Sequence, residues 1–392
     1  MSSLISVNLF NNLVNYLKST ENKYKHYELD CTEMFKECTS LENINIFNSN
    51  KSDDNFYQNE LNLRFTFTDM FNGCTSLKYF HCFNFQNQNV IFFVYDFTRM
   101  FYNCSLLLSL DLSSINIRDL SFYKRLVISF YHMFYGCNNL RSLKLFTIGN
   151  STFIRDKEFD FREVFTGFSS LRELDLSNKY ISNYERSYFN FNKGFYGCKL
   201  KSLNISNIHN ITIKSFSQMF EGCNELELII TSNLNIYIEG DMNYMFKNCT
   251  SLKKIDLSAF RLNKAINMKG MFNGCNSLKE INIANTKFPN VNSTEEMFFG
   301  CSSLNSIDLS GFDFIPNYVD NMFAYCSSLE YINIYNFYLL QTTSYNNIFL
   351  EIPEDIVYCS NFVNEKANYL LAILKSKKCS LADCSDFWNE KK

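Results

Sequence analysis

The chain has 392 residues, of which 46% are hydrophobic, 17% aromatic and 20% charged, and its formal net charge at pH 7 is -3. This charge balance argues against the basic footprint of a nucleic-acid-binding protein, and 12 Gly with 3 Pro argue against collagen-like or linker-like chains. No window approaches the roughly 20 apolar residues of a membrane span. We therefore expect a folded protein that neither binds nucleic acid nor inserts into a membrane.

Residues 1–30 are predicted to form an N-terminal helical cap. Apolar residues recur at helical spacing between Met1 and Thr20. The segment lacks the basic n-region and the unbroken apolar run of a signal peptide. Together with the reduced cysteines inferred below, this favours a cytoplasmic protein. The alternative is a cell-surface protein exported by another route.

A repeated unit occupies residues 31–337. Its clearest copy runs from Met245 to Ser258, and the shared pattern is M-F-x-x-C-x-S-L-x-x-I-x-L. Intervals of 25 to 36 residues separate successive copies, with a regular half at 195–337 and an irregular half at 31–194 that carries inserts. Self-similarity at such a period indicates a solenoid. The motif Phe occurs eleven times, at Phe35, Phe71, Phe101, Phe134, Phe165, Phe195, Phe220, Phe246, Phe272, Phe298 and Phe323.

Each copy of the repeat divides into two pieces. The stretch L-x-x-I-x-L alternates apolar and polar residues, which is typical of a short strand with one buried face. The stretch M-F-x-x-C spaces apolar residues three and four apart, as one helical turn would. Stacked units would share one core and pair their strands in parallel. The predicted fold class is an α/β solenoid of about eleven coils with a parallel strand ladder and helical caps at both ends.

The C-terminal residues 338–392 are predicted to cap the last coil. Apolar residues between 363 and 378 have the spacing of a closing helix. Exposed end coils of a solenoid need such caps to remain soluble.

Ten of the 15 cysteines occupy the motif position, and Phe168 replaces the cysteine in the fifth unit. A buried apolar slot tolerates this exchange, whereas a metal ligand or a disulfide partner does not. The motif cysteines also lie too far apart for the close pairs of a zinc site. We expect buried, reduced thiols and no metal at Cys38, Cys74, Cys104, Cys137, Cys198, Cys223, Cys249, Cys275, Cys301 and Cys326.

Catalytic motifs are not found in the sequence. It contains no H-E-x-x-H and no glycine-rich phosphate loop. One of the four histidines, His132, directly precedes Met133-Phe134, where we expect packing rather than catalysis. The closely spaced Cys379 and Cys384 are candidates for a disulfide. We therefore predict that the chain is not an enzyme and binds no cofactor.

The repeat resembles the BspA-like class of leucine-rich repeats, which occurs in low-GC bacteria and protists, often in surface proteins. The resemblance rests on the pattern M-F-x-x-C-x-S-L-x-x-I-D-L-S and covers residues 31–337. It implies a right-handed superhelix that serves in adhesion or protein binding, and it supplies no catalytic residues.

Two sets of strand residues are candidates for protein binding. The position between the last two apolar strand residues is Asn or Asp in eight of eleven units. It forms either a solvated face whose amides bond along the stack or a mildly acidic recognition stripe, with Asp111, Asp175, Asp256 and Asp308. Apolar or aromatic residues replace polar ones at Tyr79, Leu228, Ile230 and Tyr331.

The predicted function is a protein–protein interaction scaffold that uses the strand face and the inserts of residues 31–194. The inserts lie near residues 48–64, 84–95, 147–160 and 178–193, and loops on one edge of a solenoid often shape its binding surface. A structural subunit of a large assembly and a cell-surface adhesin are the alternatives.

Overall fold

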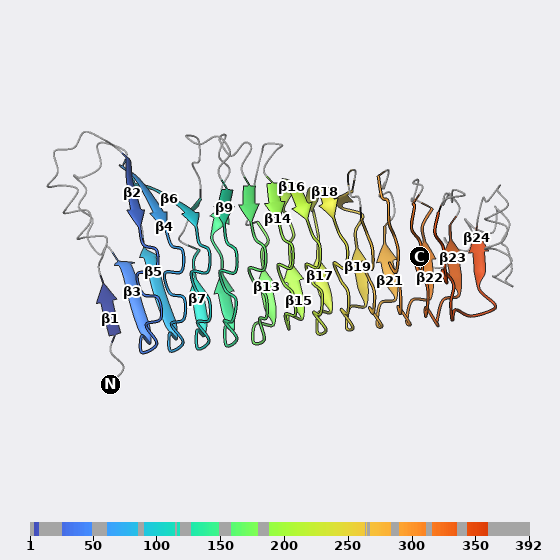
Figure 1. Cartoon of the computed structure of the whole chain (residues 1–392), viewed down its shortest axis with the longest axis horizontal. Coiled ribbons are helices and arrows are strands. Elements are labelled where there is room, and N and C mark those ends of the chain that lie inside the picture. The colour runs from blue at the N-terminus through green and yellow to red at the C-terminus, as the bar shows by residue number, and fades with distance from the viewer. Residues whose placement is uncertain are drawn as a thin grey trace. The chain divides into compact units, whose positions relative to one another are not determined.

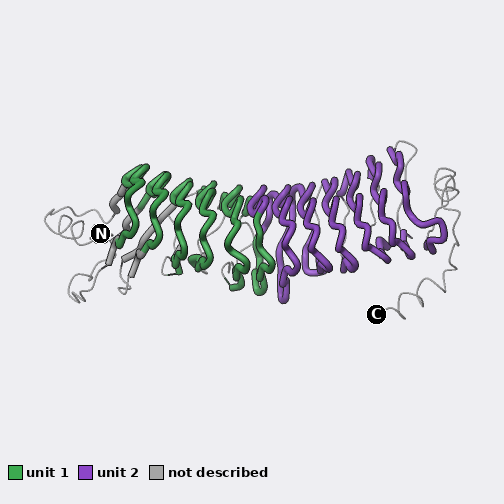
Figure 2. The backbone as a smooth tube through the Cα atoms, turned by 90° about the horizontal axis from the view of Figure 1, so that it is seen from below, with its two compact units in different colours: residues 1–190, 198–211 green, residues 191–197, 212–392 purple. Residues whose placement is uncertain are grey.

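The computed structural model describes residues 4–7, 26–48, 61–84, 90–113, 116–117, 127–148, 158–178, 188–262, 264, 267–283, 290–310, 316–334 and 343–359. They fall into two compact units, shown in Figure 2. Unit 1 consists of Met1–Asn190 and Cys198–Ile211, and unit 2 of Phe191–Gly197 and Thr212–Lys392. Parallel strands and turns build both units, and the described residues contain no helix.

A first ladder of parallel strands arises from the L-x-x-I-x-L pieces (Figure 1). In unit 1 its order is β1 (Leu4–Val7), β3 (Asn43–Asn48), β5 (Tyr79–Asn84), β7 (Ser109–Asp111) and β10 (Ser142–Lys144), and β13 (Glu173–Asp175) pairs with β15 (Ser202–Asn204). Unit 2 contributes β17 (Leu228–Ile230), then β19 (Lys254–Asp256) with β21 (Glu280–Asn282), and β22 (Ser306–Asp308), β23 (Tyr331–Asn333) and β24 (Val357–Cys359). The parallel strand ladder predicted from the repeat is therefore confirmed.

A second ladder, which the repeat pattern did not predict, precedes each motif turn. In unit 1 its order is β2 (His26–Asp30), β4 (Leu61–Thr66), β6 (Val90–Asp96), β9 (Val127–Ser129), β12 (Glu158–Asp160) and β14 (Tyr188–Asn190). In unit 2 the order is β16 (His209–Ser215, of which 212–215 lie in this unit), β18 (Asn235–Asp241) and β20 (Phe260–Arg261). A separate short pair joins β8 (Asn116–Ile117) to β11 (Thr147–Ile148).

The M-F-x-x-C segment is a turn and not the helical turn that its spacing suggested. Two residues flanking the motif Phe adopt left-handed backbone conformations, as Asp69 (φ 53°) and Gly73 (φ 77°) do around Phe71. Helical hydrogen bonding cannot continue through such residues. Instead, alternate amides bond to the next coil: the Phe71 N–H donates to the Met100 carbonyl at 2.9 Å. The turns therefore stack by backbone hydrogen bonds, much as strands do.

The motif phenylalanines form a stacked column inside each unit. In unit 1 the rings of Phe71 and Phe101 lie 5.5 Å apart at an interplanar angle of 7°. In unit 2 the column runs from Phe195 to Phe349, and neighbouring rings lie 5.3 to 5.8 Å apart. Such offset stacking adds to the stabilisation from area burial. Phe349 is a further rung that the repeat pattern missed, because Ile348 precedes it and no cysteine follows at the motif spacing.

The motif cysteines are buried, as predicted, from Cys74 onward. Each buried motif thiol also donates a hydrogen bond to the carbonyl of the motif Phe one coil earlier. The sequence had suggested that these cysteines only fill an apolar position, so this hydrogen bond was not expected. In unit 2 the Cys275 Sγ lies 3.0 Å from the Phe246 carbonyl oxygen, and that oxygen also accepts the Cys249 N–H of its own coil at 3.0 Å. The donor–acceptor distances of the nine thiols span 2.7 to 3.2 Å.

Two cysteines depart from this arrangement. Cys38 is exposed, because no described motif turn precedes its own turn in unit 1. Cys359, at the end of β24, is disulfide-bonded. The predicted pairing of Cys379 with Cys384 lies outside the described residues.

Both predicted caps overlap strands. Leu4–Val7 is strand β1 and His26–Asp30 is strand β2, so helix was the wrong expectation for these residues, which pair in parallel with neighbouring coils. In the region assigned to the C-terminal cap, β24 continues the first ladder by pairing with β23. Residues 363–378 lie outside the described part. The number of complete coils stays a prediction, because several connecting segments are also outside it.

Alkaline pH should weaken the fold through the buried thiols. Burial raises the pKa of Cys74, Cys137 and Cys326 from the ordinary 9.0 to about 12. Stabilisation from these thiols is complete below pH 9 and is lost between pH 9 and 12, because the unfolded chain ionises first. Each thiol should lower the unfolding free energy by about 1.4 kcal/mol per pH unit in that window.

Urea unfolding followed by circular dichroism between pH 8 and 11 measures this slope. The matched control is the triple variant Cys74→Ala/Cys137→Ala/Cys326→Ala, which retains the tyrosines that also ionise in this range. The variant should show a shallower pH dependence. An identical slope in both proteins would contradict the assignment of the effect to the thiols.

Candidate interaction surfaces

The outer face of the first ladder displays the first and third residues of most of its three-residue strands, whereas all three residues of β23 are buried. In β7, β13 and β19 the middle residue is buried and both flanking residues are exposed. A strand places successive side chains on opposite faces, so the outer face is formed by alternate residues. The predicted candidates Asp111, Asp175 and Asp256 are exposed on this face, and Asp308 is partly exposed there.

Five strand carboxylates and amides accept a backbone hydrogen bond within their own coil, and Asp111 also pairs with Lys144 of the next coil at 3.0 Å. The Asp256 Oδ1 accepts hydrogen bonds from the Ser258 N–H at 2.8 Å and from the Ser258 hydroxyl at 2.6 Å. The same contact with the backbone N–H two residues later is made by Asp111, Asp175, Asn204 and Asp308. These are Asx turns, which end a strand by satisfying a backbone donor. For these five residues the local turn replaces the amide ladder along the stack that the sequence suggested.

Three of the four apolar exceptions are exposed. Tyr79 has 42% of its surface accessible, Leu228 39% and Ile230 37%. Tyr331 is fully buried, so its predicted position on the surface is wrong. Strand β24 covers its strand on the open side, and the Tyr331 hydroxyl lies 3.0 Å from the Cys359 Sγ.

Leu228 and Ile230 form an exposed apolar pair on β17. The neighbouring strand β19 carries the exposed Lys254 and Asp256 at its outward positions. An ion pair between Glu227 and Lys253 at 3.8 Å lies beside the two strands. We name Leu228 and Ile230 the β17 pair. It combines a small apolar centre with a charged rim, the usual anatomy of a protein interface.

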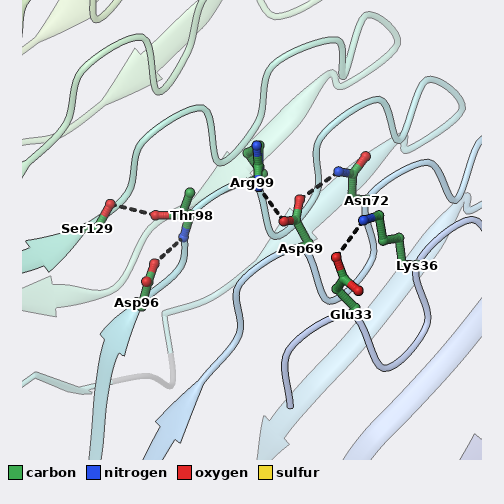
Figure 3. A network of polar contacts seen from close by, with 8 residues as sticks. All are labelled: Glu33, Lys36, Asp69, Asn72, Asp96, Thr98, Arg99 and Ser129. Atoms are coloured by element: carbon green, nitrogen blue, oxygen red, sulfur yellow. Dashed lines mark hydrogen bonds and ion pairs between the residues drawn. The ribbon is translucent and has the colours of Figure 1, made fainter. Parts of the chain in front are cut away.

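A second group, missed by the sequence analysis, lies on the motif turns of unit 1. Figure 3 shows the polar contacts of this group. The buried Asp69 lies between Asn72 of its own turn and Arg99 of the next turn. The Asp69 Oδ2 accepts a hydrogen bond from Arg99 Nη2 at 2.6 Å. This ion pair raises the pKa of the Arg99 guanidinium. Asp96 of the same network accepts the Thr98 N–H at 2.8 Å.

Aromatic side chains continue this group over the next two coils. The rings of Tyr102 and Tyr135 stack with centroids 5.0 Å apart, and Tyr131 and His132 stack at 3.9 Å. His132 Nε2 lies 2.9 Å from a carboxylate oxygen of Glu163 in the next coil. We expected this histidine to pack against its neighbours, and the contact that it makes is an ion pair or hydrogen bond between coils. A signal was present in the sequence: Tyr, His and Arg occupy the variable positions around the motif Phe.

Other site types are not seen in the described residues. Within them, no three His, Cys, Asp or Glu side chains gather as a metal site would require. In the same part of the chain no helix has the length and apolarity needed to cross a membrane.

The Asx turns predict a specific mutational pattern at Asp256. Asp256→Ala removes the acceptor of a backbone N–H and should lower the unfolding free energy by about 1 kcal/mol. Asp256→Asn should cost much less, because Asn204 makes the same contact in its own coil. Chemical unfolding of the two variants measures the difference. Equal losses would show that the charge, and not the turn, is what matters.

One family model and several solved structures are similar to this chain. A family model described as "Mycoplasma protein of unknown function, DUF285" matches residues 186–312 and 241–362, together less than half of the chain. No curated protein matches the sequence. Among solved structures, an internalin from Listeria monocytogenes is similar at 12% identity and a TM-score of 0.27, covering 83% of this chain and 82% of that one.

Two further solved structures are similar to this chain. A leucine-rich-repeat protein from Leptospira interrogans has 13% identity and a TM-score of 0.24, covering 96% of this chain and 100% of its own. A plant peptide hormone receptor, solved in complex with RGF2, has 13% identity and a TM-score of 0.26, covering 91% of this chain and 62% of its own. With its repeated motif and parallel strand ladders, the described part of the chain is a solenoid of stacked repeats.

Proposed function

We propose that the chain is a protein–protein interaction scaffold whose partner contacts the outer face of the first ladder and the inserts of residues 31–194. The observation that carries this proposal is the exposure of the β17 pair. Leu228 and Ile230 are 39% and 37% exposed on a strand whose middle residue is buried. Apolar side chains held outward by a rigid strand contribute to binding when a partner removes them from water.

The chemistry of the described coils supports binding rather than catalysis. The recurring Cys and Phe residues are committed to the core, and the recurring Asp residues close turns. The residues at the outward-facing positions differ from coil to coil. Variation on a constant scaffold is how solenoid proteins build binding surfaces.

We also propose a repeat class, a cellular location and a kind of partner for this chain. The repeat motif supports membership of the BspA-like class. Eleven free cysteines among the described residues favour a cytoplasmic location, against the one disulfide-bonded cysteine among them, Cys359. The partner is proposed to be another protein, and neither a nucleic acid nor a membrane.

The proposal is tested with Leu228→Ser/Ile230→Ser in the full chain. Both residues are exposed, so the variant should fold with a stability change within about 0.5 kcal/mol. Quantitative pull-down with mass spectrometry should show partner capture reduced at least tenfold, as loss of apolar anchors of about 1 kcal/mol or more each would cause.

Tyr318→Ser is the matched control, because Tyr318 is 50% exposed in the same unit but is not part of the first ladder and forms isolated bridges with Ser293 and Ser344. Its partner set should equal that of the wild type. If the β17 variant also retains every specific partner at wild-type level, the strand face is not the binding surface.

A further inference from the structure

We propose that the motif turns of unit 1 form a second binding surface, which takes an extended, carboxylate-rich protein segment. The surface consists of Arg99, Tyr102, Tyr131, Tyr135 and Arg162, which we name the arginine–tyrosine patch. It shares no residue with the β17 pair, so this inference goes beyond the proposed function and either one can fail alone.

Two ion pairs of this surface expose their positive groups to solvent. The Arg99 side chain is 45% exposed, whereas that of its partner Asp69 is 4% exposed. Likewise, Arg162 is 49% exposed and its partner Asp160 is 10% exposed. Both ion pairs therefore bury the negative group and present the positive one to solvent. A ligand that meets this surface encounters guanidinium groups first.

Both guanidinium groups are held in place by their contacts. Asp160 accepts hydrogen bonds from Arg162 Nε at 2.8 Å and from Nη2 at 2.6 Å, and the Arg162 guanidinium carbon lies 5.2 Å from the Tyr131 ring centroid. Arg99 is fixed through Nη2 alone. A guanidinium carries five N–H donors, so each arginine keeps Nη1 available for a carboxylate. Fixing the side chain beforehand reduces the entropy lost on binding.

The tyrosines supply contact area and polar groups between the two arginines. Tyr102, Tyr131 and Tyr135 are partly exposed. Rigid aromatic side chains with a hydroxyl group are favoured at protein interfaces. The faces of Tyr102 and Tyr135 stack on each other, and the face of Tyr131 lies against His132. Each of these rings therefore has one face already occupied by a neighbouring ring, which disfavours the stacking of nucleic-acid bases between them.

The spacing of the arginines specifies the ligand further. Arg99 follows β6 and Arg162 follows β12, with β9 between them in the second ladder. Two spacings of about 4.8 Å place their backbones roughly 10 Å apart. A polyproline II segment rises about 3.1 Å per residue and repeats every three residues. Glutamates at every third position of such a segment are about 9 Å apart, close to the separation of the two arginine backbones.

The experiment measures fluorescence anisotropy of a labelled peptide with the sequence Glu-Pro-Pro repeated three times, binding to the full chain. The wild-type protein should bind it and should bind the matched Gln-Pro-Pro peptide at least tenfold more weakly. Arg99→Gln/Arg162→Gln should weaken binding at least tenfold, since a charge-assisted hydrogen bond contributes about that factor or more. Circular dichroism and thermal unfolding check that each variant folds.

Two further variants keep the result decisive. Asp69→Asn/Arg99→Gln removes the arginine without leaving a buried carboxylate unpaired, and it should weaken binding by a similar factor to Arg99→Gln alone. Arg141→Gln/Arg172→Gln removes the same charge from exposed positions beside the first ladder of unit 1, and binding should change less than twofold.

Four outcomes would overturn the proposal. They are no binding of the glutamate peptide, equal binding of the glutamine peptide, an equal loss in the Arg141/Arg172 control, and tighter binding of a single-stranded oligonucleotide at the same ionic strength. The last two indicate unspecific electrostatic attraction and a nucleic-acid surface, respectively. None of these results bears on the β17 pair, which is tested with a different variant.

Discussion

The carbonyl group of the motif Phe holds neighbouring coils together. It accepts an N–H of its own coil, as Phe246 does from Cys249, and in nine cases it also accepts the S–H of the motif Cys in the next coil. Cysteine suits this position because it is small and apolar yet carries a weak donor. The Phe rings then stack in register, and the strands on either side pair in parallel.

This arrangement determines where function can lie. Inward positions are fixed by the core, and the Asp or Asn at the strand ends is used to close a turn. Only the outward positions of the strands and turns are free to differ between coils. The β17 pair and the arginine–tyrosine patch are both groups of such outward residues, one in each unit. Recognition by this protein is therefore expected to depend on local exceptions to the repeat.

The sequence predicts the repeat, the first ladder and the buried cysteines, because these follow from apolar periodicity. It did not predict the second ladder because the recognised pattern began at the motif Met, although buried apolar residues recur six positions before the motif Phe, at Phe65, Ile128, Phe159 and Phe189. The turns were mistaken for helix because Met, Phe and Cys have the same spacing in both conformations. Tyr331 was misplaced because β24 lies outside the recognised repeat. The arginine–tyrosine patch requires knowledge of which turns stack, which one sequence does not supply.

The thiol hydrogen bonds are the most direct test of this account. Raman spectroscopy of the S–H stretching band reports on hydrogen bonding by thiols in the native protein. The account predicts a band dominated by a component at lower wavenumber than that of an unbonded thiol in an apolar solvent, and this component should weaken on substitution of Cys249, Cys275 and Cys301 by Ala. A native band at the position of unbonded thiols would contradict it, and the cysteines would then be apolar filling alone.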